Sequence, residues 1–427
     1  MAKTPRTTTT VRDLRSGNQS RALWDVYLNG PLTRQEIADH AGLSLASVSN
    51  LVGALLRQGV VEEVGLEDSN GGRPRGLLQV NPEYGFVIGV DMGETAFLVE
   101  LFDLGMQVRA RHVSTTTDEH PTPEEAVGHM LDGIRAVTAE AGVDDDRILG
   151  IGVAVPGLVE HGRDANSDAV VHGQSIGWPG VPLERMLRRG TDLPILIDNG
   201  AKTLGQAEKW FGAARDTDDA VIVLLGIGAG TCVISNRQLY RGATSSAGEW
   251  GHTTVSIDGR LCRCGARGCL EAYIGAGAIA ARYDQLRRRR RRTRSIELEE
   301  RVAAILNAGP DDPAAREVVK ETVDYLGAGI ADLVNLFNPE RVVVGGWLGQ
   351  ALTERLLTPI RKAAGKHALT LPFSHVEIVE AALGKDAVAL GAATLPVASL
   401  LAGGAVTGEP YAHSRARARA RPGLART

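Results

Sequence analysis

Apolar side chains recur at helical spacing in three short segments near the start of the chain, and these segments are residues 20–30, 33–42 and 44–59. In each of them the apolar positions fall on one face, which predicts an amphipathic helix. Residues 60–80 instead alternate apolar and polar side chains around a Ser-Asn-Gly-Gly turn, which predicts a β-hairpin. Three helices followed by a hairpin is the order of a winged helix-turn-helix.

Capping residues mark the boundaries of these helices. The second helix opens with Thr33 and Glu36, which have the spacing of a capping box, and it closes on Gly42. We therefore place the winged helix-turn-helix domain at residues 20–82. The polar, threonine-rich residues 1–19 that precede it are expected to be disordered.

From residue 84 onward the pattern changes to buried strands that end in glycine turns. A strand–turn–strand unit opens this region, in contrast to the strand-to-helix transition of a dinucleotide-binding fold. Further elements are expected as strands within 148–160, 193–200, 220–234 and 341–349 and as helices at 201–211, 270–286 and 313–337. Strands that alternate with helices predict an α/β fold.

The composition agrees with a globular protein of more than one domain. The 427 residues suffice for two or three domains, and 43% are hydrophobic and 23% charged. No apolar run approaches the roughly 20 residues that span a bilayer, and the first residues lack the apolar core of a signal peptide. We therefore expect a cytoplasmic protein with no membrane partner. The net charge of −4 means that any contact with nucleic acid must come from a local basic patch.

Two segments are rich in arginine. The run of six arginines at residues 287–292 is interpreted as a solvated surface loop in preference to a nucleic-acid-binding arm. Residues 401–427 form an arginine-rich tail that is expected to be disordered.

The turn between the second and third helices predicts a surface that reads DNA. Apolar residues of the third helix face inward, and a recognition helix contacts base edges with its first outward positions. Those positions are Ser44, Ala46, Ser47 and Asn50. Arg73 and Arg75 flank a proline at the tip of the hairpin, where they suit a phosphate backbone or a minor groove. The alternative is a small helical interaction domain that has no role with nucleic acid.

Four potential metal ligands lie close together in the chain. His252, Cys262, Cys264 and Cys269 fall within 18 positions, and one imidazole with three thiolates completes a tetrahedral zinc shell without an open position. The sequence thus predicts a structural zinc ion. The alternative is a set of buried free thiols, which is our expectation for Cys232 alone.

Five motifs together resemble one protein family. They are "VIGVDMGET" (87–95), "GIGVAVPGLV" (150–159), "AGEWGH" (247–252), "CRCGARGCLE" (262–271) and "ALGKDAVALGAATL" (382–395). Over residues 20–400 the chain resembles the ROK family of repressors, open reading frames and sugar kinases, and in particular its regulators with an N-terminal winged helix. The resemblance implies an actin-like, ribonuclease-H-like sugar kinase fold with two lobes. The first lobe would comprise 84–205 and 380–400, and the second 206–379.

The resemblance also implies a sugar pocket between the two lobes. The residues that it assigns to sugar contacts are Asn199, Glu249, His252 and Glu271. The kinases of the family carry an aspartate, the general base, directly after the asparagine, and this chain has Gly200 there. A missing general base costs about 10²–10⁴ in rate. We therefore expect a pocket that holds a sugar without phosphorylating it, and Asp198 as a substitute base is the alternative.

The nucleotide side of the family pattern is kept in part. Asp91, Gly93 and Thr95 match the first phosphate loop, and the glycines of residues 226–230 stand where the second is expected. The bulky Trp347 departs from the small residue usual in the adenosine motif. We do not expect ATP to bind.

These observations together predict a sugar-responsive transcriptional regulator, and we expect it to act as a repressor. Its partners would be operator DNA, a small sugar or sugar derivative, and further copies of the chain in a dimer or a tetramer. Two alternatives stay open, namely a sugar kinase with a DNA-binding appendage and a repressor that is controlled by another protein.

Overall fold

The structure is a computed structural model that describes residues 11–67, 74–94, 96–116, 121–161, 168–288, 297–308 and 312–404. The chain divides into two compact units. The smaller comprises Met1–Tyr84 and Val397–Thr427, and the larger comprises Gly85–Pro396. Several predicted features fall outside the described residues wholly or in part, namely the Ser-Asn-Gly-Gly turn, Arg73, Thr95, the arginine run and the two chain ends.

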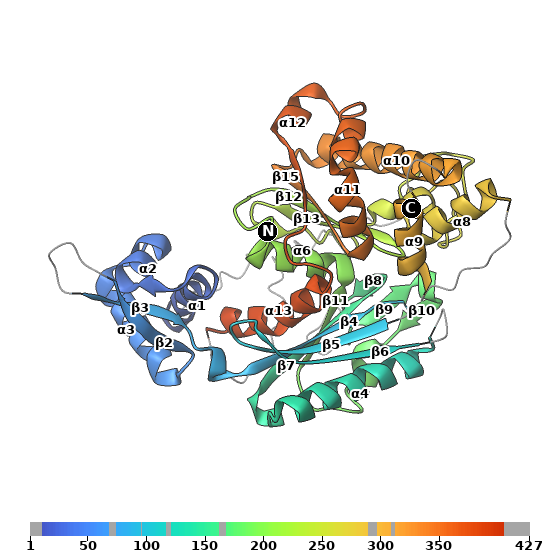
Figure 1. Ribbon diagram of the computed structural model, residues 1–427. Helices are drawn as coiled ribbons and strands as arrows, with labels where there is room; N and C mark the ends of the chain where they lie inside the picture. The colour runs from blue at the N-terminus through green and yellow to red at the C-terminus, as the bar shows by residue number, and fades with distance from the viewer. Residues whose placement is uncertain are drawn as a thin grey trace, which may run out of the picture. The chain divides into compact units, whose positions relative to one another are not determined.

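The smaller unit contains the predicted winged helix-turn-helix (Figure 1). Its helices are α1 (Val11–Asn29), α2 (Arg34–Ala41) and α3 (Leu45–Gln58). Its strands are β1 (Leu32–Thr33), β2 (Val61–Glu67) and β3 (Arg75–Val80), which form one sheet in the order β1-β3-β2. A short 3₁₀ turn, Pro82–Tyr84, follows the last strand.

Local sequence explains where α2 begins and ends. The Glu36 backbone N–H donates to Thr33 Oγ1, and the Thr33 N–H donates to the Glu36 carboxylate over 2.7 Å, so the predicted capping box is present. The helix ends at Gly42, whose φ of +64° lies in the left-handed region that favours glycine. These caps set the angle at which the chain enters α3.

Helix α1 begins earlier than the sequence predicted. It starts at Val11, so the expectation of disorder in residues 1–19 is wrong for residues 11–19. This polar segment has little apolar periodicity, but tertiary contacts support its end. Gln19 Nε2 donates to Gly404 O and Ser20 Oγ donates to Leu401 O, each over 2.8 Å. Residues 401–404, which we expected in the disordered tail, are thus ordered, and residues 405–427 lie outside the described part.

The larger unit contains two five-stranded sheets of the same topology. The first consists of β4 (Phe86–Met92), β5 (Ala96–Asp103), β6 (Val108–Thr115), β7 (Ile148–Val155) and β11 (Ile195–Asn199). The second consists of β12 (Ala220–Leu225), β13 (Ala229–Ser235), β14 (Gln238–Leu239), β15 (Arg341–Gly345) and β16 (Glu377–Glu380). In each sheet the first three strands along the chain pair antiparallel. The fourth strand pairs parallel with the first, and the fifth pairs parallel with the fourth.

This repeated topology agrees with the predicted two-lobed α/β fold. Both sheets have the order third-second-first-fourth-fifth when their strands are counted along the chain. The predicted strand of residues 148–160 divides into β7 and β8 (Leu158–Glu160). With β9 (Val170–Gly173) and β10 (Trp178–Val181), β8 forms a small third sheet.

Helices cover the sheets. Helix α4 (Pro123–Ala141) packs against β5 and β6 of the first sheet (Figure 1), with α5 (Leu183–Leu187) beside it. Helix α6 (Gly200–Phe211) follows β11, and α13 (Ala387–Ala402) begins in the larger unit. The backbone of α13 passes so close to the sheet that a Cβ on Gly152 would lie 1.8 Å from Ala392 O. This approach explains why a glycine occupies the middle of a buried strand.

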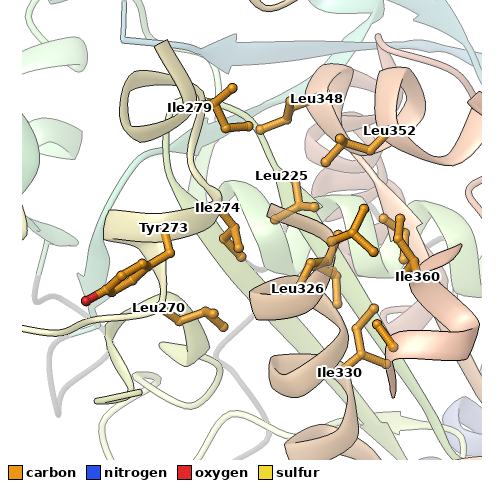
Figure 2. Close-up of a cluster of buried hydrophobic side chains, with 14 of the residues drawn as sticks. Leu225, Leu270, Tyr273, Ile274, Ile279, Leu326, Ile330, Leu348, Leu352 and Ile360 are labelled. Carbon is orange, nitrogen blue, oxygen red and sulfur yellow. The ribbon is translucent and has the colours of Figure 1, made fainter. Parts of the chain in front are cut away.

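The second lobe has a large apolar core, part of which Figure 2 shows. The cysteine-rich loop, residues 252–269, leads directly into it. The helices of this lobe are α7 (Glu271–Ile274), α8 (Ala276–Leu286), α9 (Leu298–Asn307), α10 (Pro313–Phe337), α11 (Trp347–Ala364) and α12 (Thr370–His375). The predicted helix of residues 270–286 is two helices that break at Gly275. Leu270 and Ile274 are fully buried in this core, so they anchor the chain directly after Cys269. Of the described helices, none is both long and apolar enough to cross a membrane.

Candidate functional site

The four predicted metal ligands converge in the structure. Their ligand atoms all lie within 4.8 Å of one another, and together they could hold a metal ion. His252 Nδ1 lies 3.8 Å from Cys262 Sγ, and Cys264 Sγ lies 3.8 Å from Cys269 Sγ. The side of the imidazole that faces the thiols is therefore Nδ1, which leaves Nε2 for a different partner.

The spacing of the sulfur atoms fits a tetrahedral ion. Zn–S bonds of about 2.3 Å at tetrahedral angles place two sulfur atoms about 3.8 Å apart. The Cys264–Cys269 separation equals that value. A disulfide would require a much shorter distance of about 2.0 Å, and all four cysteines are free. The donor set and its geometry thus fit the predicted group.

Two glycines allow the loop to fold around this cluster. Gly265 and Gly268 have φ values of +89° and +78°, in the left-handed region. A Cβ on Gly268 would lie 1.6 Å from Ser256 O, so no larger residue fits there. Bridges between Thr254 and Cys269 and between Leu261 and Arg267 close the loop.

Three of the four predicted sugar contacts lie around this loop. Glu249 interacts electrostatically with both His252 and Glu271. Burial raises the pKa of the Glu249 carboxyl above its usual value, and Glu271 adds to this shift while His252 and Lys202 oppose it. The sequence prediction that Glu249, His252 and Glu271 form one group is consistent with this proximity, although their contact with a sugar stays a prediction.

Glu271 is held by several neighbours. Its Oε2 accepts a hydrogen bond from the Ala229 N–H over 3.0 Å, and its Oε1 lies 3.7 Å from Cys262 Sγ. The residue is 6% exposed and lines a hollow of about 1020 Å³ that Cys262 also lines. Asn199, Glu249 and His252 are not among the residues that line this hollow. The hollow and the predicted sugar group therefore meet at Glu271.

Asn199, the fourth predicted sugar contact, also makes hydrogen bonds within the fold. Its Oδ1 accepts from the Ala201 N–H over 2.9 Å and caps α6, and its Nδ2 donates to Gly157 O over 2.8 Å. An amide nitrogen carries two hydrogens. One donor of Asn199 thus remains for a ligand after these bonds are made.

A buried ion group lies directly beside Asn199, and the sequence reasoning missed it. Asp198 Oδ2 lies 2.7 Å from Arg241 Nη2, and the Asp198 side chain is 4% exposed. Lys202, one turn into α6, is 1% exposed; its ammonium donates to Ser245 O and is attracted by Asp198 and Glu249. A lysine on the buried face of a predicted helix is the signal that could have revealed this group, because a buried ammonium needs a partner.

The surroundings of Asp198 make it a weak base. Burial acts to raise its pKa, but the charge of Arg241, its hydrogen bond and the charge of Lys202 together hold the pKa below the usual value. A carboxylate with a lowered pKa has little affinity for a proton at neutral pH. Asp198 is thus poorly suited to replace the missing general base.

At Gly200, where the resemblance implies the aspartate of a kinase, a larger side chain can begin without a clash. A Cβ at this position would have its nearest neighbour, Leu224 Cδ2, 3.7 Å away. This is ordinary van der Waals distance, so the fold does not require a glycine there. We refer to Asn199, Glu249, His252 and Glu271, together with the Asp198 ion group, as the sugar side.

On the predicted nucleotide side, an ion pair joins the phosphate loop to the cysteine-rich loop. Glu94 Oε2 lies 2.6 Å from Arg263 Nη1, and the Glu94 side chain is 10% exposed. Arg263 Nη2 also lies 3.6 Å from Glu271 Oε1. Glu94 follows Gly93 in the loop that the resemblance assigns to phosphate, so a carboxylate occupies a place where phosphate would need positive or neutral groups. The sequence reasoning overlooked this residue.

Two further features distinguish the nucleotide side. A Cβ on Gly226 would lie 3.1 Å from Trp347 Nε1, so the indole lies against the second glycine loop. Burial and the charges of Asp386 and Glu100 raise the pKa of Asp91 to about 7. Burial and the charge of Asp386 likewise raise the pKa of Glu100 to about 7, against the opposing charge of Arg111. We refer to this region, around Asp91, Glu94 and Trp347, as the nucleotide side.

In the smaller unit, the predicted DNA contacts lie at the exposed start of α3. Ser44, Ala46, Ser47 and Asn50 are all exposed. Ser44 Oγ accepts from the Ser47 N–H over 3.2 Å and lies 2.9 Å from Ser47 Oγ, so both hydroxyls take part in the helix cap. Arg75 is exposed at the start of β3. Arg73 lies outside the described residues.

Comparisons with known proteins cover both units. The ROK family profile matches residues 87–398, and the profile of the IclR helix-turn-helix domain matches residues 28–65. The xylose repressor of Caldicellulosiruptor bescii is 30% identical over 397 residues, which cover 91% of this chain and 97% of that protein. The DNA-binding transcriptional dual regulator NagC of Escherichia coli is 29% identical over 407 residues, which cover 92% of this chain and 94% of NagC.

Solved structures give the same relation. A ROK family transcriptional regulator described as a homolog of the E. coli MLC protein aligns with a TM-score of 0.73 at 25% identity, over 92% of this chain and 98% of its own. A ROK family glucokinase from Streptomyces griseus, in complex with glucose and AMPPNP, aligns with a TM-score of 0.62 at 28% identity, over 73% of this chain and 99% of its own. With a matching profile over most of its length and relatives that share both units, this chain belongs to the ROK family.

Proposed function

We propose that this protein is a sugar-responsive, DNA-binding transcriptional regulator that acts as a repressor. The observation that carries the proposal is the combination of a winged helix-turn-helix with a larger unit that has the sugar side and lacks the general base. Relatives that align over more than nine tenths of this chain are named as a xylose repressor and as the regulator NagC. A repressor acts where the operator is, so we propose a cytoplasmic location.

The proposed ligand is a small neutral sugar or sugar derivative. A sugar offers a ring of hydroxyl groups, each of which both donates and accepts a hydrogen bond, and carboxylates with an imidazole can pair with them at fixed angles. Glu249, His252 and Glu271 supply such groups, and Asn199 supplies one amide donor. We propose these four residues as the sugar contacts.

We propose that a structural zinc ion holds this pocket in shape. His252, Cys262, Cys264 and Cys269 would be its ligands, and the 3.8 Å separation of two of the sulfur atoms supports this choice. With Nδ1 of His252 directed to the metal, Nε2 would face a sugar hydroxyl. The ion would thereby determine which imidazole nitrogen meets the ligand.

The proposal excludes sugar phosphorylation as the function. Gly200 cannot accept a proton from a sugar hydroxyl, and the paired Asp198, with its lowered pKa, is a poor substitute. Glu94 adds a negative charge to the loop that a nucleotide phosphate would approach. Sugar kinase activity with Asp198 as base, the alternative that the sequence left open, therefore receives no support from these contacts.

The DNA contacts that we propose are the exposed start of α3, with Ser44, Ala46, Ser47 and Asn50, and the wing arginines Arg73 and Arg75. A homodimer or tetramer would place two such heads in successive major grooves of a palindromic operator. Sugar binding would change operator affinity only if the sugar has different affinities for the DNA-bound and free arrangements. By linkage, DNA would then weaken sugar binding by the same factor.

A thermal-shift screen of sugars and sugar phosphates tests the proposal. A true ligand should raise the melting temperature of the wild-type protein, and at 100 times its dissociation constant it should add about 2.7 kcal/mol to the free energy of unfolding. The same compound should have no effect on Glu249→Ala. The active sugar is then added to operator-binding assays. An operator affinity that does not change with a bound sugar would contradict sugar-responsive regulation and would favour control by another protein.

A further inference from the structure

The recognition helix presents an apolar side chain that the fold does not use. Leu45, the first residue of α3, is 47% exposed. The core-facing side of this helix is formed by other residues, and these are Val48, Leu51, Val52 and Leu55. A single exposed leucine is unremarkable on most surfaces. Here, however, it occupies the turn with which a recognition helix contacts base edges.

Two polar side chains next to Leu45, those of Ser44 and Ser47, take part in the helix cap. Ser44 Oγ accepts from the Ser47 N–H over 3.2 Å and lies 2.9 Å from Ser47 Oγ. These two hydroxyls, proposed above as DNA contacts, already bond to the helix start and to each other. The exposed side chains of this turn that lie outside the cap are the apolar Leu45 and Ala46.

The outward stripe of the same helix is shallow. Ala46, Asn50 and Gly53 follow one another at intervals of four and three residues, so they lie on one face. A Cβ on Gly53 would have Arg57 Nη1 as its nearest neighbour, 3.5 Å away, so an alanine would fit. Glycine is a poorer helix former than alanine. Its presence is thus not required by the fold.

The major groove offers one kind of apolar group, the C5-methyl group of a pyrimidine. It belongs to thymine, or to 5-methylcytosine in modified DNA, and apolar side chains are its usual partners. We propose that Leu45 is a specificity residue that contacts the C5-methyl group of a thymine in each operator half-site. Asn50, one turn beyond Ala46, contributes the amide that pairs with N6 and N7 of an adenine. The inference rests on the DNA binding proposed above.

The first part of the experiment finds the half-site without knowledge of the operator. The full-length wild-type protein selects from a library of randomised 30-base-pair duplexes, and the Leu45→Ala variant selects from the same library. We expect a thymine in one column of each wild-type half-site. The variant should enrich the same half-site without a preference in that column, and its affinity for a scrambled duplex should equal that of the wild type.

The second part removes only the methyl group. Replacing the selected thymine by deoxyuridine should weaken wild-type binding about fourfold per half-site, which is the effect of exposing one buried methyl group. Binding by Leu45→Ala should not change. Leu45→Met should keep the discrimination because it keeps an apolar contact. Leu371→Ala, which alters a leucine that is 71% exposed in the larger unit, should behave as wild type.

A cytosine arm separates the two sources of the methyl group. A duplex with cytosine in the thymine column should bind weakly, and 5-methylcytosine there should recover part of the affinity, because the methyl group is the same. Tighter binding of 5-methylcytosine than of thymine would overturn the choice of thymine.

Three other results would overturn the inference. They are a wild-type protein that is insensitive to deoxyuridine, an equal loss in Leu45→Ala, and a selected half-site without a thymine column. Failure to enrich any sequence would instead reject the proposed DNA binding itself.

Discussion

Asp198 on the sugar side and the carboxyl groups of Asp91 and Glu100 on the nucleotide side have pKa values shifted in opposite directions. On the sugar side, Asp198 is paired with Arg241 over 2.7 Å, and Lys202 lies close by, so the pKa of the aspartate is lowered although burial acts to raise it. On the nucleotide side, burial and neighbouring carboxylates raise the pKa values of Asp91 and Glu100 to about 7. The difference lies in the nearest charges: Asp198 faces the cations Arg241 and Lys202, whereas Asp91 faces the carboxylates of Asp386 and Glu100.

This difference indicates which ligand each region suits. A neutral sugar brings no charge, so a pocket for it must balance its own ionised groups. A nucleotide triphosphate with magnesium brings both charges, and its loops need amides and glycines rather than carboxylates. Glu94, paired with Arg263 over 2.6 Å, places a carboxylate in such a loop. We infer that the sugar side is maintained for binding and that the nucleotide side has lost its ligand.

Removal of the metal should have the largest effect. Cys264→Ser should reduce the zinc content from about one ion per chain to nearly none, because it removes one of the four proposed ligands. The binding energy of a structural zinc ion contributes to folding, so stability should fall as well. The sugar-dependent thermal shift should disappear and the larger unit should lose several kcal/mol of stability. Metal analysis and calorimetric melting measure both. Cys232→Ala, which alters a buried cysteine outside the cluster, should keep its zinc. A wild-type protein purified without metal under reducing conditions would contradict the proposed zinc site.

Removal of the charge of Glu94 should strengthen nucleotide binding. Glu94→Gln removes a negative charge from this loop and releases Arg263 from its ion pair, so the variant should bind AMPPNP about tenfold more tightly than the wild type, an effect of about 1.4 kcal/mol. Isothermal titration calorimetry gives the two affinities. Glu140→Gln, at an exposed position near the end of α4, serves as the matched control. Micromolar affinity of the wild type for AMPPNP would contradict the inference that the nucleotide side no longer binds a nucleotide.

The contributions of Glu100 and Asp198 to the free energy of unfolding should change with pH in opposite directions. A carboxyl group with a raised pKa stabilises the fold below its unfolded pKa, and this contribution is lost as the pH rises through the folded value, here about 7 for Glu100. The shift from 4.5 to about 7 corresponds to about 3 kcal/mol. Asp198 has a lowered pKa, so its contribution is present above pH 3.8 and is lost as the pH falls below that value.

Glu100→Gln should therefore flatten the loss of stability between pH 5 and pH 8, because it removes one of the two carboxyl groups whose pKa is raised to about 7. Chemical denaturation at a series of pH values measures the slope. Arg111 keeps a partner in the variant, since it also lies 2.9 Å from Asp386. Glu140→Gln should leave the slope unchanged. An equal slope in Glu100→Gln and wild type would contradict the raised pKa of Glu100.

Restoring the missing aspartate should have the smallest effect. The Cβ of Gly200→Asp fits at 3.7 Å from its nearest neighbour, and an acidic residue at the first position of α6 interacts favourably with the helix dipole. We expect stability within about 1 kcal/mol of the wild type and still no ATP-dependent phosphorylation of the identified sugar, because the nucleotide side remains closed. Strong kinase activity in this single variant would locate the whole loss of function at Gly200.

Local signals in the sequence predicted much of the fold. Caps and apolar spacing depend on residues that lie within a few positions of one another, and they located α2, α3, α6 and α10 to within one or two residues. The convergence of His252 with Cys262, Cys264 and Cys269 was predictable for the same reason, since the four residues are close in sequence. The start of α1 at Val11 was not predictable, because the contacts that support the helix come from residues 401–404, at the other end of the chain.

The charges of the candidate site were mostly beyond reach of the sequence. Glu94 and Arg263 are 169 positions apart, and Asp198 and Arg241 are brought together only by the tertiary fold. A motif shows that a loop is glycine-rich, but it does not show which distant side chain lies across from that loop. The resemblance to the ROK family supplied the sugar residues, whereas the partners that balance their charges became visible only in the structure.

The central claim is that the larger unit binds a sugar and no longer phosphorylates it. The most direct test titrates the sugar identified by thermal shift into the wild-type protein by calorimetry and then adds magnesium and ATP to the same sample. We predict a saturable heat of sugar binding followed by no formation of ADP above the background rate. Release of ADP at a typical enzymatic rate of 1 s⁻¹ or more would contradict the account.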